Sequence, residues 1–176
     1  MNTDIKKYIR SVKDFPKPGI MFRDITTLLK EPEGLKASFN ELIKFTEGLK
    51  VDKVVGIESR GFMLGAMIAE YLNAGFIPIR KPGKLPAETV REEYSLEYGT
   101  DAIEMHKDSI KQGESILLHD DLLATGGTAC AAVKLIEKLG GKVAQISFII
   151  ELSFLNGREK LKGYDVRSLV TYDGED

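Results

Sequence analysis

Residues 116–128, ILLHDDLLATGGT, combine side chains that can bind a phosphorylated sugar. An apolar strand ends in two adjacent carboxylates, and a Gly-Gly pair then opens a helix. Unpaired N–H groups at a helix start attract a phosphate, and glycines let the backbone come close to it. Carboxylates accept hydrogen bonds from vicinal ribose hydroxyls. The pattern predicts a ribose 5-phosphate site formed by Asp120, Asp121, Ala124, Thr125, Gly126, Gly127 and Thr128.

Other phosphate-binding patterns fit this stretch less well. No Gly-Lys-Ser/Thr follows the glycines, and the GxGxxG spacing of a dinucleotide site is missing. The stretch could instead be a polar turn between a strand and a helix with no binding function. Such a turn does not explain thirteen consecutive residues that suit one ligand. The hydroxyl groups of Thr125 and Thr128 can also donate hydrogen bonds to a phosphate, and a threonine suits the N-cap position of a helix.

Composition limits the classes of protein to consider. The 176 residues carry 25 Lys and Arg against 27 Asp and Glu, a formal charge of −2, so we expect no broad nucleic-acid or membrane-binding surface. One cysteine, Cys130, excludes an intrachain disulfide. The apolar content of 43% suits a globular protein, and the N-terminal stretch lacks the apolar run of a signal peptide. We therefore expect a single cytoplasmic domain over residues 1–176.

The elements that position the motif alternate along the chain. Short Val- and Ile-rich runs predict strands at 51–58, 75–80, 115–120, 142–151 and 166–172, and helical periodicity marks 32–48, 60–72 and 128–139. Continuously apolar strands are typical of a sheet that is covered on both faces. The sequence predicts an α/β fold with an open, mainly parallel twisted sheet flanked by helices, and ligands in such sheets bind beyond the carboxyl ends of the strands.

The phosphate-binding stretch resembles the phosphoribosyl pyrophosphate signature of the type I phosphoribosyltransferases. Its residues 122–128 are most similar to those of the members that act on adenine. The resemblance covers nearly the whole chain and includes residues 15–25 (FPKPGIMFRDI), 56–62 (GIESRGF), 76–86 (FIPIRKPGKLP), 94–99 (YSLEYG) and 157–161 (GREKL). His119 departs from it, because the family usually has a small apolar residue there. Since strand side chains alternate, we expect His119 to point away from the site.

The resemblance implies transfer of phosphoribose from phosphoribosyl pyrophosphate to adenine, giving AMP and pyrophosphate, with Mg²⁺ required. Mg²⁺ would be held mainly by the diphosphate and water, with Asp120 and Asp121 nearby. Breaking the anomeric bond leaves positive charge on the ribose and negative charge on the diphosphate, so basic groups are needed at the leaving group. The expected diphosphate site consists of Ser59, Arg60, Arg80, Lys81 and Lys84.

Two segments are expected to enclose the reacting atoms. Residues 81–99 are polar, contain two prolines and read as a long irregular segment, which is typical of a flexible lid loop that excludes water. The resemblance places Glu97 and Tyr98 on this lid as catalytic residues, together with Arg60, and Glu97 is the candidate for the proton at the purine N7. Residues 1–34 contribute a hood over the base, and the expected adenine pocket comprises Met21, Phe22, Arg23 and Leu152.

Two alternatives remain open. The first keeps the fold and changes the base to hypoxanthine, guanine, xanthine or orotate, against which the match over residues 15–25 argues. The second is a nucleotide-sensing regulator without catalysis, against which the missing DNA-binding module and the lid residues argue. The family resemblance also implies a homodimer.

Overall fold

The computed structural model describes residues 4–95 and 99–175. Its centre is a five-stranded, all-parallel sheet with strand order β4-β3-β7-β8-β9. These strands span Lys53–Ile57 (β3), Gly75–Ile79 (β4), Ser115–Leu123 (β7), Lys142–Leu152 (β8) and Val166–Tyr172 (β9). The predicted parallel α/β sheet and its five strands are confirmed, with ends that differ by up to three residues.

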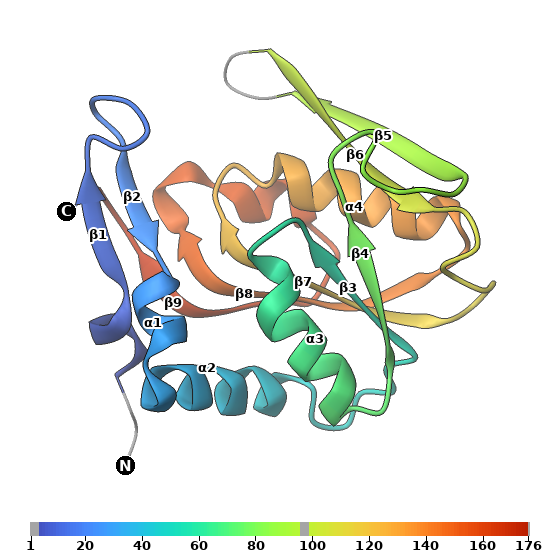
Figure 1. The fold of residues 1–176 in the computed structure, drawn as a ribbon, viewed down its shortest axis with the longest axis horizontal. Coiled ribbons are helices and arrows are strands. Elements are labelled where there is room, and N and C mark those ends of the chain that lie inside the picture. The colour runs from blue at the N-terminus through green and yellow to red at the C-terminus, as the bar shows by residue number, and fades with distance from the viewer. Residues whose placement is uncertain (1–3, 96–98, 176) are drawn as a thin grey trace.

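Helices cover both faces of this sheet (Figure 1). On one face lies α4 (Gly127–Lys138), and on the other lie α2 (Pro32–Phe45) and α3 (Gly61–Tyr71). Alternation along β7 divides its side chains between two cores: Ile116 and Leu118 pack in the α4 core, and Leu117 packs in the α3 core. The strand is buried on both faces, as its apolar sequence predicts.

Two β-hairpins extend beyond the sheet at opposite ends of the molecule (Figure 1). At the N-terminus, β1 (Arg10–Lys13) pairs with β2 (Met21–Asp24), and α1 (Thr26–Lys30) follows. The second hairpin pairs β5 (Thr89–Ser95) with β6 (Thr100–His106), and its strands pack along α4. Short 3-10 turns complete the chain: η1 (Ile5–Tyr8), η2 (Ser153–Leu155) and η3 (Gly157–Leu161).

The hairpin β5–β6 corrects one expectation. An irregular segment over residues 81–99 is wrong for its second half, because residues 89–95 form a regular strand. The physical reason is a weak alternation, in which Val90 and Tyr94 pack against the α4 core and Glu92 pairs with Lys134 of α4, while Arg91 and Glu93 are exposed. Residues 81–88 have the expected irregular backbone.

The strand order places the site. From β3 the chain crosses through α3 to β4 on one side, and from β7 it crosses through α4 to β8 on the other. The two crossovers therefore leave the sheet in opposite directions from the neighbouring strands β3 and β7. At such a point the carboxyl ends of the two strands border a crevice. Every helix of the described residues is too short or too polar to cross a membrane.

Candidate functional site

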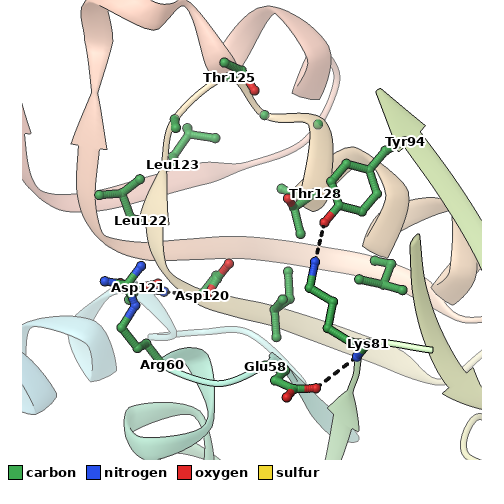
Figure 2. Close-up of a pocket in the computed structure, with 16 residues that line it drawn as sticks. Glu58, Arg60, Lys81, Tyr94, Asp120, Asp121, Leu122, Leu123, Thr125 and Thr128 are labelled. Carbon is green, nitrogen blue, oxygen red and sulfur yellow. Dashed lines mark hydrogen bonds and ion pairs between the residues drawn. The ribbon is translucent and has the colours of Figure 1, made fainter. Parts of the chain in front are cut away.

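A cavity of about 240 Å³ opens in this crevice, at the carboxyl ends of β3 and β7 (Figure 2). Its wall brings together all seven predicted ribose-phosphate residues and part of the predicted diphosphate site. The lining residues are Ile57, Glu58, Arg60, Lys81, Tyr94, Ile103, Asp120, Asp121, Leu122, Leu123, Ala124, Thr125, Gly126, Gly127, Thr128 and Ala129.

The phosphate loop, residues 124–128, ends on the first turn of α4. Gly126 is the N-cap residue of α4, with φ +76 and no side-chain hydrogen bond at the cap. The expectation that Thr125 or Thr128 caps the helix is therefore wrong. A left-handed cap is the conformation that glycine adopts at least cost. Both threonine side chains line the cavity region instead (Figure 2). Backbone N–H groups at the start of a twelve-residue helix are thus available to a phosphate.

Gly157 of η3 supports this loop from behind. A Cβ atom on Gly126 would collide with the Gly157 carbonyl oxygen, and a Cβ atom on Gly157 would collide with the Ala124 carbonyl oxygen. Only two glycines allow this backbone contact. Arg158 anchors the same turn by donating two hydrogen bonds to the buried Glu151 carboxylate, at 2.6 and 2.7 Å. Sequence reasoning quoted residues 157–161 only as part of the resemblance and missed this support.

Asp120 and Asp121 line the cavity between the phosphate loop and Arg60 (Figure 2), and this part of its wall is called the floor below. Asp121 is 4% exposed, and its Oδ2 lies 3.0 Å from Arg60 Nε. Burial raises the pKa of both carboxyl groups; the Asp121 charge adds to the effect on Asp120, and Arg60 opposes it on both. A pair held this way gains by binding ribose hydroxyls or a cation, because each favours the ionised carboxylate.

His119 does not line the cavity. It is fully buried, and its Nδ1 lies 2.9 Å from the Ser147 hydroxyl oxygen on β8. Burial lowers the pKa of His119 to about 4, so its ring is neutral at pH 7. A Cβ atom on Gly65 would lie 3.7 Å from its ring, which places His119 against α3. This departure from the family pattern is therefore a packing change beneath the site.

The predicted diphosphate residues divide into two groups. Arg60 and Lys81 line the cavity, whereas Ser59, Arg80 and Lys84 are not part of its wall. Arg80 and Lys84 both pair with Glu58, at 3.2 and 2.7 Å. Burial opposes ionisation of Glu58, but hydrogen bonds from Lys84, from the Lys81 N–H and from Arg80 together lower its pKa to about 2.

The predicted adenine pocket lies apart from this cavity. Met21, Phe22, Arg23 and Leu152 are absent from its wall. The Phe22 ring stands near its edge, with its centroid 5.0 Å from the Arg60 guanidinium carbon. Arg23 is 3% exposed and packs over the Tyr172 ring at 4.0 Å, so its side chain supports the hood. The expectation that main-chain atoms of Arg23 face the base stays a prediction.

Glu97 and Tyr98 lie outside the described residues. Their assignment as catalytic groups therefore stays a prediction. The described part of the same hairpin adds two residues that sequence reasoning did not assign to the site, Tyr94 and Asp101. The Tyr94 hydroxyl lies 3.0 Å from Lys81 Nζ, and Asp101 forms an ion pair with the same ammonium group.

Within residues 4–95 and 99–175, no cluster of three or more His, Cys, Asp or Glu side chains could hold a metal ion. The carboxylates of the half-buried Asp120 and the buried Asp121 nevertheless suit a hard cation, which prefers oxygen ligands. Asp120 and Asp121 thus fit an ion whose other ligands come from substrate and water.

Comparison with known proteins assigns the family. The phosphoribosyl transferase domain family matches residues 25–171. An adenine phosphoribosyltransferase of Christiangramia forsetii is 57% identical over 96% of this chain and 99% of its own length. That of Methanococcus vannielii is 52% identical over 97% and 98%.

Solved structures agree. The crystal structure of adenine phosphoribosyltransferase from Thermoanaerobacter pseudethanolicus superposes with a TM-score of 0.94 and 52% identity, covering 98% of this chain and 100% of that one. The Saccharomyces cerevisiae enzyme, complexed with an imino-altritol bisphosphate and adenine, gives 0.88 at 38% identity, covering 96% and 98%. The chain belongs to the phosphoribosyltransferase family and, within it, groups with the adenine phosphoribosyltransferases.

Proposed function

We propose that this chain transfers the 5-phosphoribosyl group from phosphoribosyl pyrophosphate to adenine, releasing AMP and pyrophosphate, as an enzyme of purine salvage. One observation carries the proposal: a backbone phosphate loop, a pair of adjacent carboxylates and two basic side chains line a single cavity. Each matches one part of the sugar substrate. The relatives named as adenine phosphoribosyltransferases support adenine as the base.

The proposed mechanism relies on positioning and charge. The phosphate loop holds the 5-phosphate, and Asp120 and Asp121 hold the ribose hydroxyls. The bond between C1 of the ribose and the diphosphate oxygen breaks, and its electron pair leaves with pyrophosphate. Arg60, Arg80, Lys81 and Lys84 stabilise that developing negative charge, and Ser59 lies in the same turn. Adenine N9 forms the new bond to C1.

The hood and the lid complete the proposed reaction. Main-chain atoms of Met21 and Arg23 would bind the adenine edge, and Phe22 and Leu152 would form apolar walls. As N9 attacks C1, the purine loses one proton, and Glu97 would accept that proton from N7, with Tyr98 next to it in the sequence on the lid over residues 81–99. In a Glu97→Ala variant we expect kcat to fall more than adenine affinity does, and an unchanged kcat would exclude this assignment.

Mg²⁺ is the proposed cofactor. When bound, it neutralises charge on the diphosphate. Asp120 and Asp121 are the residues of this chain that would approach it, mostly through substrate and water. Loss of activity with a chelator and its recovery with added Mg²⁺ would test this requirement.

We infer a homodimer that works in the cytoplasm. The outer face of α3 presents Met63, Met67 and Tyr71, which are 42%, 36% and 60% exposed and recur every fourth residue. Such an apolar stripe suits a second copy of the chain. Light scattering should give twice the 19.5 kDa chain mass, and a monomer would contradict the proposal. A charged, phosphorylated substrate that does not cross membranes supports the cytoplasm, and cell fractionation tests it.

The decisive test is one incubation with phosphoribosyl pyrophosphate, Mg²⁺ and equal amounts of adenine, hypoxanthine, guanine, xanthine and orotate. We expect AMP alone when the nucleotides are separated by chromatography, and none without phosphoribosyl pyrophosphate. A different nucleotide would agree with the assignment of the phosphate loop and would show that the assignment of the hood to adenine is wrong. Binding of phosphoribosyl pyrophosphate without any nucleotide would favour the sensing alternative.

A further inference from the structure

Every basic side chain of the proposed diphosphate site is paired with a carboxylate of the chain itself. The pairs are Arg60 with Asp121, Arg80 and Lys84 with Glu58, and Lys81 with Asp101. Asp121 belongs to the proposed ribose site, so its pairing has a second explanation. Glu58 and Asp101 have none in the mechanism proposed above.

Glu58 holds its partners away from the cavity. Its Oε1 accepts hydrogen bonds from Lys84 Nζ at 2.7 Å and from an Arg80 terminal nitrogen at 3.4 Å. Its Oε2 accepts from Arg80 Nε at 3.2 Å and from the Lys81 N–H at 2.9 Å. Glu58 itself lines the cavity, whereas Arg80 and Lys84 do not. To contact a diphosphate there, the two cations must exchange Glu58 for the ligand.

Asp101, which lies on β6 and is not part of the cavity wall, pairs with Lys81. The Lys81 ammonium reaches into the cavity and ends between the Asp101 carboxylate and the Tyr94 hydroxyl (Figure 2 shows the contact with Tyr94). The Tyr94 hydroxyl also lies 3.2 Å from Asp101 Oδ2, which closes a triangle of polar groups. The Lys81 side chain is 40% exposed, so a diphosphate could reach it.

We propose that Glu58 and Asp101 are resident anions, which occupy the diphosphate-binding cations in the empty site and are exchanged for diphosphate oxygens when the ligand binds. The inference rests on the proposed function, because it takes Arg80, Lys81 and Lys84 as the diphosphate ligands. Each carboxylate then competes with pyrophosphate. The cost of breaking these pairs weakens pyrophosphate binding and speeds release of the product.

The competing explanation is a plain scaffold, in which the carboxylates only hold the cations in place. The two explanations predict opposite signs when the charge is removed and the shape is kept. Loss of a competitor strengthens pyrophosphate binding, because the cations no longer have to leave an ionised partner. Loss of a scaffold weakens it. General damage to the protein also weakens binding, so stronger binding cannot arise from damage.

The test compares Glu58→Gln and Asp101→Asn with a matched control, Glu88→Gln. Glu88 directly precedes β5, is paired with Lys107 at 3.0 Å and has an 83% exposed side chain, so its variant makes the same charge change outside the cavity wall. Calorimetric titration with inorganic pyrophosphate and Mg²⁺ gives the dissociation constant, and adenine KM serves as the second measurement.

We expect the pyrophosphate dissociation constant to fall on the order of tenfold in Glu58→Gln, which frees two cations, and about threefold in Asp101→Asn, which frees one. Glu88→Gln should leave it unchanged, and adenine KM should stay the same in all three. Unchanged or weaker pyrophosphate binding in both site variants would overturn the inference, as would an equal gain in the control. If Glu58→Gln does not fold, Asp101→Asn on the half-exposed hairpin decides the sign.

The outcome is separable from the proposed function. Failure of the unaltered protein to form AMP refutes the activity, whatever the variants do. An active protein whose site variants bind pyrophosphate no more tightly refutes the resident anions alone.

Discussion

The two ends of the cavity offer anions different kinds of group, and we propose that they bind their ligands by different means. At the phosphate loop, the binding groups belong to the backbone and are fixed by packing, because Gly126 and Gly157 leave no room for a side chain. At the proposed diphosphate end, the groups are long basic side chains that are paired with carboxylates and are between 34% and 49% exposed.

The difference follows what each end does in the proposed reaction. The 5-phosphate stays attached to the same sugar from substrate to product, so a rigid backbone site loses nothing by being preformed. The diphosphate must be held while its charge develops and then released. Side chains with an internal partner suit that second task, because they return to a neutralised state when the product leaves.

The largest expected effect is at the floor that the two ends share. Replacing both Asp120 and Asp121 with Asn removes both negative charges, exchanges one acceptor oxygen of each side chain for an NH2 donor and leaves Arg60 without its ionised partner. We expect kcat/KM for phosphoribosyl pyrophosphate to fall at least about 100-fold while the fold persists. The reason is that a small displacement of the bound sugar from its reactive position lowers the rate by this much. Steady-state kinetics and circular dichroism measure the two quantities.

A control with the same change in charge is Asp108→Asn combined with Glu47→Gln, both exposed and away from the cavity. It should keep full activity. Full activity in the Asp120 and Asp121 double variant would remove the ribose assignment and, with it, the idea of a floor common to both ends.

Gly157→Ala should affect one end alone. The added methyl group collides with the Ala124 carbonyl oxygen and must displace the phosphate loop. We expect AMP to bind at least about tenfold more weakly, because the loop donates from fixed backbone positions, while pyrophosphate binding stays unchanged. Gly174→Ala is the matched control, since its Cβ would meet nothing within 4 Å. An equal loss for both ligands would erase the contrast between rigid and exchangeable ends.

The sequence predicted which residues come together at the phosphate-loop end of the cavity. Residues 120–128 are contiguous, so their types and order already define the phosphate loop and the carboxylate floor. The parallel strands were equally predictable, because burial on both faces leaves a continuous apolar run such as ILL at 116–118.

The exchangeable end was less predictable because its contacts join distant parts of the chain. Arg80 meets Glu58 across 22 residues, and Lys81 meets Asp101 across 20. Neither carboxylate carries a local signal that marks it as a partner. The β5–β6 hairpin was missed for a related reason: its alternation becomes meaningful only once α4 is known to cover one face.

The smallest expected effect tests whether the support behind the phosphate loop acts at a distance. Arg158→Ala leaves the buried Glu151 without its two guanidinium hydrogen bonds, although Ser168 still contacts it. We expect AMP binding to weaken about threefold, less than in Gly157→Ala, because η3 loses an anchor and keeps its backbone contact with the loop. Arg167→Ala, which removes the neighbouring pair with Asp165 at 2.7 Å, is the matched control.

The pH dependence separates this anchor from general damage. Hydrogen bonds from Arg158 lower the pKa of Glu151 against the effect of burial, so the pair stabilises the fold above the unfolded pKa of that carboxyl and loses its effect as pH falls through the folded value. The loss of unfolding free energy in Arg158→Ala, about 1–3 kcal/mol at pH 7 for a buried acceptor left without its partner, should therefore shrink in acid. A deficit that is independent of pH would show that Arg158 stabilises η3 by packing, and the brace on the phosphate loop would then rest on the glycine contact alone.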